Sequence, residues 1–136
     1  MKTLKSKIIA LENLHLVIST LLILVIGLVY GISPNDTLPK LFGFIVENIN
    51  LKNVFRSLMG LYIAMSSIWL MAIINKKLWV TATITNIAFM SGLAIGRIIS
   101  LIFDGIPGIY FLLGLIGEIV LAVWGIVNLL HYKRKS

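Results

Sequence analysis

Apolar residues form four long stretches along the chain, and short polar segments separate them. The stretches cover approximately residues 13–32, 53–74, 78–103 and 109–130. A helix of about 20 residues is roughly 30 Å long, which matches the hydrocarbon core of a bilayer. The pattern therefore predicts an all-α membrane protein in which residues 1–136 form one domain, a bundle of four transmembrane helices.

The longest connection lies between the first and second stretches, from Ser33 to Lys52. It begins with the turn-forming sequence Ser-Pro-Asn-Asp. Apolar residues then recur at helical spacing, at Leu38, Leu41, Phe42, Ile45, Val46 and Ile49. This spacing favours a short helix that lies along the membrane interface in the first outer loop, and an ordered loop that caps the bundle is the alternative.

Composition excludes most other classes of protein. Hydrophobic residues make up 59% of the chain and charged residues 12%, whereas about a quarter of the residues in a soluble domain are charged. The chain has no cysteine, which excludes disulfides and thiolate-based catalytic or metal sites. Phosphate-binding loops, catalytic triads and zinc-binding helix motifs do not occur in the sequence either. We therefore assign no catalytic residue, no metal site and no cofactor.

Basic residues lie mainly at the ends of the apolar stretches. Eight of the twelve are Lys2, Lys5, Lys7, Lys76, Lys77, Lys133, Arg134 and Lys135. By the positive-inside rule, both termini and the connection at residues 76–77 are expected in the cytoplasm, with the protein in the inner (plasma) membrane. No segment outside the predicted spans combines basic and stacking residues, so we expect membrane lipids and no nucleic acid as partners.

A basic segment followed by an apolar stretch also occurs in secretory signal peptides. The first stretch is long for the apolar region of such a peptide, and no clear small-residue cleavage site follows it. We therefore expect an uncleaved first span.

Three charged residues fall inside the predicted spans: Arg56 near the start of the second, Arg97 within the third and Glu118 near the middle of the fourth. A charge at the centre of a membrane helix costs about 2.5–3.5 kcal/mol on insertion scales. We therefore expect these side chains to face the interior of the bundle and to find partners there. Arg97 is predicted to pair with Glu118 across the third and fourth helices, with Arg56 and Asp104 nearer the outer surface.

Each predicted helix has one face that gathers polar or small residues at three- and four-residue steps. On the third helix the stripe has seven positions, five of them polar: Thr83, Asn86, Met90, Leu93, Arg97, Ser100 and Asp104. On the other helices the positions are Glu12, His15, Ser19 and Tyr30, then Arg56, Gly60 and Ser67, and lastly Gly114, Glu118, Ala122 and Gly125. We expect the four faces to converge on one buried polar network. Its predicted members are Arg56, Arg97, Asp104, Glu118, Asn86 and Ser100.

The two histidines and several aromatic residues have simpler interpretations. His15 is expected to be a core or interfacial residue and His131 an interfacial one, because neither has a set of neighbouring metal ligands in the sequence. Four aromatic residues fall near predicted span ends, where amphipathic rings settle at the headgroup level: Tyr30, Trp79, Tyr110 and Tyr132.

Two sequence segments and Glu118 carry a resemblance to a known family. The segments are Arg56-Ser-Leu-Met-Gly60-Leu-Tyr62 and Gly96-Arg97-Ile-Ile-Ser100-Leu-Ile-Phe-Asp104-Gly105-Ile-Pro107. The chain resembles, over nearly its whole length, a family of small bacterial four-helix membrane proteins catalogued only as a domain of unknown function (family 4345), which is distantly similar to the DoxX-type membrane proteins. The Gly-Arg … Asp-Gly-x-Pro stretch is the most specific part. The resemblance implies a bacterial inner membrane and a shared core that contains Arg56, Arg97, Asp104 and Glu118, and it implies no established reaction.

Several functions are compatible with this pattern. Intramembrane ionisable residues often mark binding sites or proton paths, so the first hypothesis is that a small or amphiphilic molecule with a polar or anionic head reaches Arg56 and Arg97 from the outer leaflet and is bound or transported. Alternatively, the network only fixes the packing of the helices. A further alternative is a structural or accessory subunit that binds itself or another membrane protein through the small-residue face of the fourth helix. The last alternative is a lipid-modifying enzyme that uses Glu118 or Asp104 as acid or base. We favour a binding protein over an enzyme.

Overall fold

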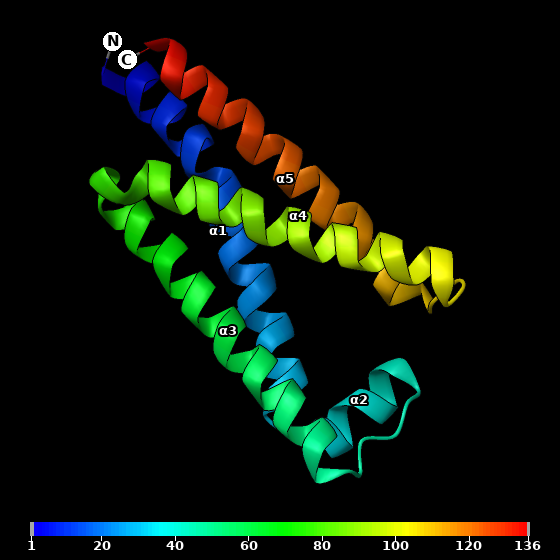
Figure 1. Ribbon diagram of the computed structural model, residues 1–136. Helices are drawn as coiled ribbons and strands as arrows, with labels where there is room; N and C mark the ends of the chain where they lie inside the picture. The colour runs from blue at the N-terminus through cyan, green and yellow to red at the C-terminus, as the bar shows by residue number, and fades with distance from the viewer. Residues whose placement is uncertain (1, 136) are drawn as a thin grey trace.

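The computed structural model describes the backbone of residues 2–135 and the side chains of residues 12–134. Five helices and one 3₁₀ turn make up this part of the chain (Figure 1): α1 (Lys2–Gly31), α2 (Pro34–Phe42), α3 (Ile49–Ile74), η1 (Lys76–Leu78), α4 (Trp79–Phe103) and α5 (Ile109–Lys135). No strand occurs among the residues that the structure describes. The predicted all-α fold is confirmed.

Four helical segments are long and apolar enough to cross a membrane. They are Glu12–Gly31, Ile49–Ile74, Lys76–Phe103 and Ile109–Arg134. The predicted number of spans is thus confirmed, although α3 begins at Ile49 and not near residue 53. Length and composition together make the chain a multi-pass membrane protein.

Polar residues and glycine fix where the helices start and stop. The Asn48 side chain caps α3 by accepting a hydrogen bond from the backbone N–H of Asn50 at 2.7 Å. In the tight turn between α3 and α4, the Asn75 side chain accepts a hydrogen bond from the backbone N–H of Lys77 at 3.1 Å. Gly43 ends α2 with a φ of 76°, a left-handed conformation that favours glycine.

The helix expected in the first connection is present but shorter than the spacing of its apolar residues suggests. It starts at Pro34, in the position where proline fits the first helical turn, and it ends at Phe42. Ile45 and Val46 follow in a segment without regular structure. Leu38 and Val46 are fully buried, whereas Leu41, Ile45 and Ile49 are exposed. The apolar spacing therefore predicts neither the length of the helix nor all of the buried positions correctly.

The four long helices form two pairs. α1 packs chiefly against α3, and α4 packs chiefly against α5, while contacts between the two pairs are fewer. Figure 1 shows the two pairs close together at the end of the molecule that holds both termini, and diverging toward the opposite end, where α2 lies. We call these the terminal end and the loop end.

The interior face of α3 differs from the face predicted for it. The predicted face contains Arg56 and Gly60, which are exposed, whereas the buried positions include Tyr62 and Trp69. Large aromatic side chains bury more area than the small polar ones and therefore decide which face packs inward. Ser67, also on the exposed face, donates its hydroxyl hydrogen bond to the backbone carbonyl of Ile63 in its own helix at 2.8 Å, so it needs no partner on another helix.

Candidate ligand-binding site

Arg97 of α4 and Glu118 of α5 form an ion pair between neighbouring helices. The Nε atom of Arg97 lies 2.8 Å from one carboxylate oxygen of Glu118 and 2.9 Å from the other. The Glu118 side chain is 5% exposed and that of Arg97 is 22% exposed. Each charge compensates the other where lipid cannot, which limits the cost of burying both. The pair predicted from the sequence is confirmed.

Small residues on α5 let α4 approach closely around this pair. A Cβ atom added to Gly114 would lie 3.5 Å from the Nη2 atom of Arg97. A Cβ atom added to Gly125, nearer the terminal end, would lie only 2.8 Å from the Cγ1 atom of Ile87 on α4. The predicted small-residue face of α5 therefore packs inside the chain, against α4.

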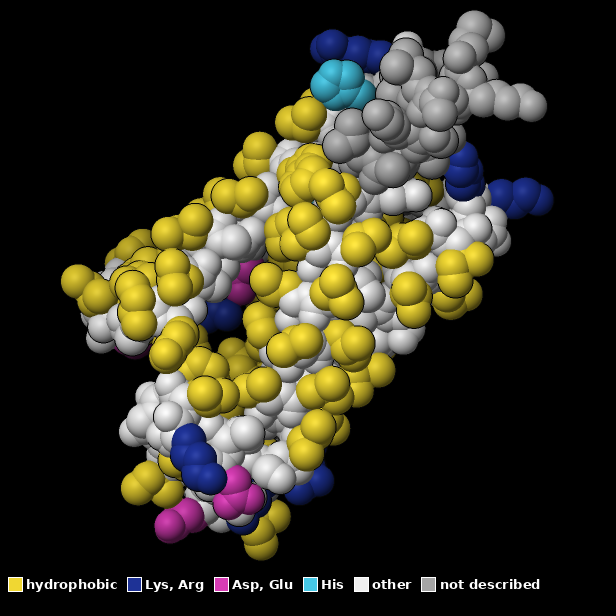
Figure 2. Space-filling view, turned by 180° about the vertical axis from the view of Figure 1, so that it is seen from behind, with side chains coloured by type: hydrophobic (Ala, Val, Ile, Leu, Met, Phe, Trp, Pro, Cys, Tyr) yellow, Lys and Arg dark blue, Asp and Glu magenta, His cyan; other side chains and the backbone are white. Residues whose placement is uncertain are grey.

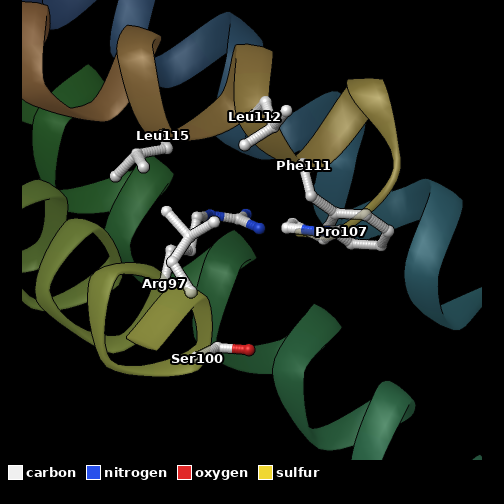
Figure 3. Close-up of a pocket in the computed structure, with 7 residues that line it drawn as sticks. Arg97, Ser100, Pro107, Phe111, Leu112 and Leu115 are labelled. Carbon is white, nitrogen blue, oxygen red and sulfur yellow. The ribbon is translucent and has the colours of Figure 1, made fainter. Parts of the chain in front are cut away.

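Glu118 occupies only one edge of the guanidinium group. Arginine has five N–H donors, and the two carboxylate oxygens share the one on Nε. The Nη side extends toward Phe111, whose ring centroid is 5.6 Å from the Cζ atom of Arg97 (Figure 3). Tyr30 of α1 lies within electrostatic reach of the same guanidinium.

A cavity of about 350 Å³ lies beside Arg97, where α1, α2, α4 and α5 meet. Most of its lining is aliphatic or aromatic, and Arg97 is the one charged residue among the described residues that line it. Figure 2 shows this face of the molecule hollowed between two arms, with hydrophobic side chains around the hollow. The size is typical of a site for a small ligand, and so is an apolar lining with a few polar groups.

A second, smaller space adjoins Arg97 from the side of the α4–α5 turn. It measures about 80 Å³, and its lining includes Ser100, Pro107 and Leu112 (Figure 3). Arg97 and Phe111 border both spaces. The guanidinium therefore lies at the junction of an apolar cavity and a narrower gap between two helices.

Aromatic rings close the larger cavity at the loop end. The ring centroid of Phe42 in α2 is 4.9 Å from that of Phe111 and 6.1 Å from those of Tyr30 and Tyr110. These contacts join α2 to both α1 and α5. The short helix is therefore part of the wall of the cavity.

The remaining residues of the predicted network do not join the Arg97–Glu118 pair. Arg56 and Asp104 are exposed, and Asp104 accepts a hydrogen bond from the Ser100 hydroxyl at 2.8 Å. Asn86 is fully buried, but it precedes Arg97 by eleven residues, or roughly 16 Å along α4. Arg56 lies in the second turn of α3, where a long basic side chain reaches the membrane interface without a buried partner.

Aromatic wall residues of the cavity were not recognised as site residues from the sequence. The sequence predicts Tyr30 both near a span end and on the converging face of the first helix; it is 8% exposed and lines the cavity, as the second prediction requires. Its position on the same face of α1 as His15 and Ser19 indicates burial but not that it lines a cavity. Phe42 and Phe111 carry no such signal, because an aromatic residue beside a turn is equally compatible with lipid contact.

No three His, Cys, Asp or Glu side chains gather as a metal-binding group in the described part of the chain. The fold and the buried ion pair define the class of this protein, a multi-pass α-helical membrane protein with a charge pair at an apolar cavity. The chain belongs to the family described as Domain of unknown function (DUF4345), whose model matches residues 11–129. No match was found among curated proteins or among solved structures.

Proposed function

We propose that this protein binds, and in its membrane carries, an amphiphilic molecule with an anionic head group in the cavity beside Arg97. The apolar part of the ligand lies against the aliphatic and aromatic lining, and the head group accepts hydrogen bonds from the Nη side of Arg97. The observation that carries this proposal is a single basic side chain at the wall of an otherwise apolar cavity of about 350 Å³.

The geometry of Arg97 supports an anionic head group. Its Nε edge is held by Glu118, which fixes the plane of the guanidinium group. The Nη edge carries the remaining donors in a planar fork that matches a carboxylate or phosphate oxygen pair. A cationic head group would be repelled by the positive charge of Arg97 and is therefore disfavoured.

The size and charge of the site favour a ligand with one chain and one negative charge. The volume lies at the lower end of the range for small-molecule sites, which fits a single acyl or prenyl chain better than two. Only one of the described residues that line the cavity is basic, and it is paired with Glu118, so Arg97 can balance one negative charge of a ligand when Glu118 takes up a proton, and a second negative charge would have no partner. Protonation of Glu118 on binding would restore neutrality. A carboxylate-headed amphiphile is therefore the ligand class that we propose first.

The access route follows from the fold and the charge pattern. The cavity lies toward the loop end, and the basic residues cluster at the terminal end, near Lys76 and Lys77. With the terminal end in the cytoplasm, as the positive-inside rule predicts, the cavity is reached from the outer leaflet.

Mass spectrometry of molecules that co-purify with the protein in mild detergent tests the proposal. The test variant is Arg97→Gln, and Arg56→Gln is the matched control, because it makes the same substitution at an exposed arginine outside the cavity. We expect the wild type and Arg56→Gln to retain an anionic amphiphile and Arg97→Gln to lose at least nine-tenths of it. Equal retention in Arg97→Gln, or no retained amphiphile in the wild type, would contradict the proposal.

A titration with two fluorescent probes tests the sign of the head group. One probe is a fatty acid and the other an alkylammonium of equal chain length. We expect saturable binding of the fatty acid only, weakened about tenfold or more by Arg97→Gln, which corresponds to the loss of a charge-assisted hydrogen bond. Equal binding of both probes would mean that the cavity selects apolar chains without reading charge.

A further inference from the structure

Tyr30 on α1 is a buried tyrosine in the wall of the large cavity beside Arg97. It is 8% exposed, whereas Tyr110, the other tyrosine in the lining, is 61% exposed. Apart from Arg97 and these two tyrosines, the described lining residues are aliphatic residues, phenylalanine and glycine. Tyr30 is therefore the one buried side chain in the described lining, besides the partly buried Arg97, that can hydrogen-bond to a ligand.

Aromatic neighbours on α2 and α3 hold the ring of Tyr30 in place. Its ring centroid lies 5.7 Å from that of Phe55 and 6.1 Å from that of Phe42, both in edge-to-face contact, and 5.9 Å from that of Tyr62. Gly27, about one turn earlier on α1, lets α3 approach closely here, because an added Cβ atom would lie 2.7 Å from the Cβ atom of Tyr62. Packing therefore fixes the position of the phenol oxygen before any ligand binds, which lowers the entropic cost of binding.

The hydroxyl group of Tyr30 lies close enough to the guanidinium group of Arg97 for the two to interact electrostatically. A guanidinium group only donates hydrogen bonds, so a phenol beside it can act toward it only as an acceptor. The O–H hydrogen of Tyr30 can then be donated to another group. An acceptor bound next to Arg97 in the cavity would receive hydrogen bonds from both side chains.

We propose, on the basis of the function proposed above, that Tyr30 is a second head-group residue of this site, whose hydroxyl donates a hydrogen bond to the anionic head group that Arg97 binds. A free carboxylate fits both donors, since its two oxygens together accept several hydrogen bonds. A methyl ester has no charge for Arg97 to bind and only weak acceptors for Tyr30. The two residues together therefore select a free carboxylate over an ester of the same chain.

This arrangement makes the ligand a link between the two helix pairs. Tyr30 belongs to the pair α1–α3 and Arg97 to the pair α4–α5. The two pairs share few contacts and diverge toward the loop end, where the cavity lies (Figure 1). A head group bound to both residues joins the pairs at this end, so bound ligand stabilises one arrangement of the two pairs.

A conservative substitution separates the hydroxyl group from the ring. Tyr30→Phe keeps the aromatic contacts and removes only the hydroxyl, and Tyr110→Phe is the matched control at an exposed tyrosine of the same cavity. Binding of a fluorescent fatty acid and of its methyl ester is measured for each variant. We expect Tyr30→Phe to weaken binding of the acid about tenfold or more, as for a lost hydrogen bond to a charged group, and to weaken binding of the ester much less. Tyr110→Phe should bind both probes like the wild type.

The outcomes distinguish this inference from the proposed function. Unchanged binding of the acid by Tyr30→Phe, with binding lost in Arg97→Gln, would refute the role of Tyr30 and leave the proposed function intact. An equal loss of acid and ester in Tyr30→Phe would show that the hydroxyl only supports the packing of the cavity. Absence of saturable fatty-acid binding by the wild type would contradict both proposals.

Solid-state NMR of the wild-type protein in liposomes gives a test that needs no variant to fold. The fatty acid carries ¹³C in its carboxylate, and the tyrosines carry ¹³C at Cζ. An O–H···O hydrogen bond of about 2.7 Å places these two carbons about 4 Å apart, so we expect a cross peak between the carboxylate and Tyr30. Tyr30→Phe assigns the peak by its disappearance. A bound fatty acid without a cross peak to Tyr30 would overturn the inference.

Discussion

The two halves of the bundle handle polar groups in the membrane in opposite ways. At the loop end, two full charges lie together at the wall of an apolar cavity and compensate each other. At the terminal end, the buried polar residues are neutral or weakly basic, tightly enclosed, and only partly hydrogen-bonded to one another. Burial alone therefore does not define a binding site in this protein. The loop end combines charged side chains with an open cavity. The terminal end has buried polar atoms that lack hydrogen-bond partners.

Removing one member of the charge pair should produce the largest effect and would sharpen this contrast. Glu118→Ala leaves Arg97 in the cavity without its partner, and breaking a buried ion pair in this way costs about 3–5 kcal/mol. We expect a lower midpoint of thermal unfolding in detergent for Glu118→Ala and for Arg97→Ala. The double variant Arg97→Met with Glu118→Leu should recover much of the stability while it abolishes binding of the fatty-acid probe. Full ligand retention in that double variant would show that the pair only supports packing.

A substitution at the close helix contact should have an intermediate effect. Gly125→Ala adds a Cβ atom that would lie 2.8 Å from the Cγ1 atom of Ile87, so either the Ile87 side chain or the two helices must shift. Overpacking of this kind typically costs about 1–3 kcal/mol. Gly117→Ala on the same helix is the control, because its added Cβ atom meets nothing within 4 Å. Unfolding in a denaturing detergent titration measures both variants, and an equal response of the two would show that the α4–α5 contact is looser than described.

Neutralising the exposed charges should have the smallest effect. Asp104→Asn keeps an acceptor for the Ser100 hydroxyl, and Arg56→Gln removes the charge of a side chain that lies on the surface. We expect each to change stability by at most about 0.5 kcal/mol, as is usual for surface substitutions. A loss comparable to that of Glu118→Ala would instead place Arg56 or Asp104 in the same electrostatic unit as Arg97.

Membrane spans and the charge pair could be predicted because each follows from a strong energetic rule. A run of apolar residues of sufficient length has few alternatives to crossing the bilayer, and charges on two consecutive helices at compatible depth have few alternatives to pairing. Arg97 and Glu118 lie on consecutive helices at compatible depth, and they form the predicted ion pair.

The inward face of α3 and the end of α2 could not be predicted from the same rules. Lipid and protein interior are similarly apolar, so Tyr62 and Trp69 carry no sign of which side they face. Arg56 is near enough to a helix start for its long side chain to reach the interface, and depth along the helix alone does not reveal this. α2 ends at Gly43 by adopting a left-handed backbone, which the apolar spacing over residues 38–49 does not encode.

The cavity wall depends on contacts between segments distant in sequence. Phe42 and Phe111 meet at 4.9 Å although they belong to the first connection and the last helix. The periodicity of apolar residues within one segment does not predict this contact, because it depends on how the two helix pairs pack together.

The position of the two charges on consecutive helices has a consequence for biosynthesis. A single short turn joins α4 and α5, which carry Arg97 and Glu118, so the two helices can enter the bilayer as one hairpin in which the opposite charges already neutralise each other. Neither helix then has to cross the lipid with an unaccompanied charge. The earlier helices, α1 and α3, then pack against a hairpin whose two buried charges already balance each other.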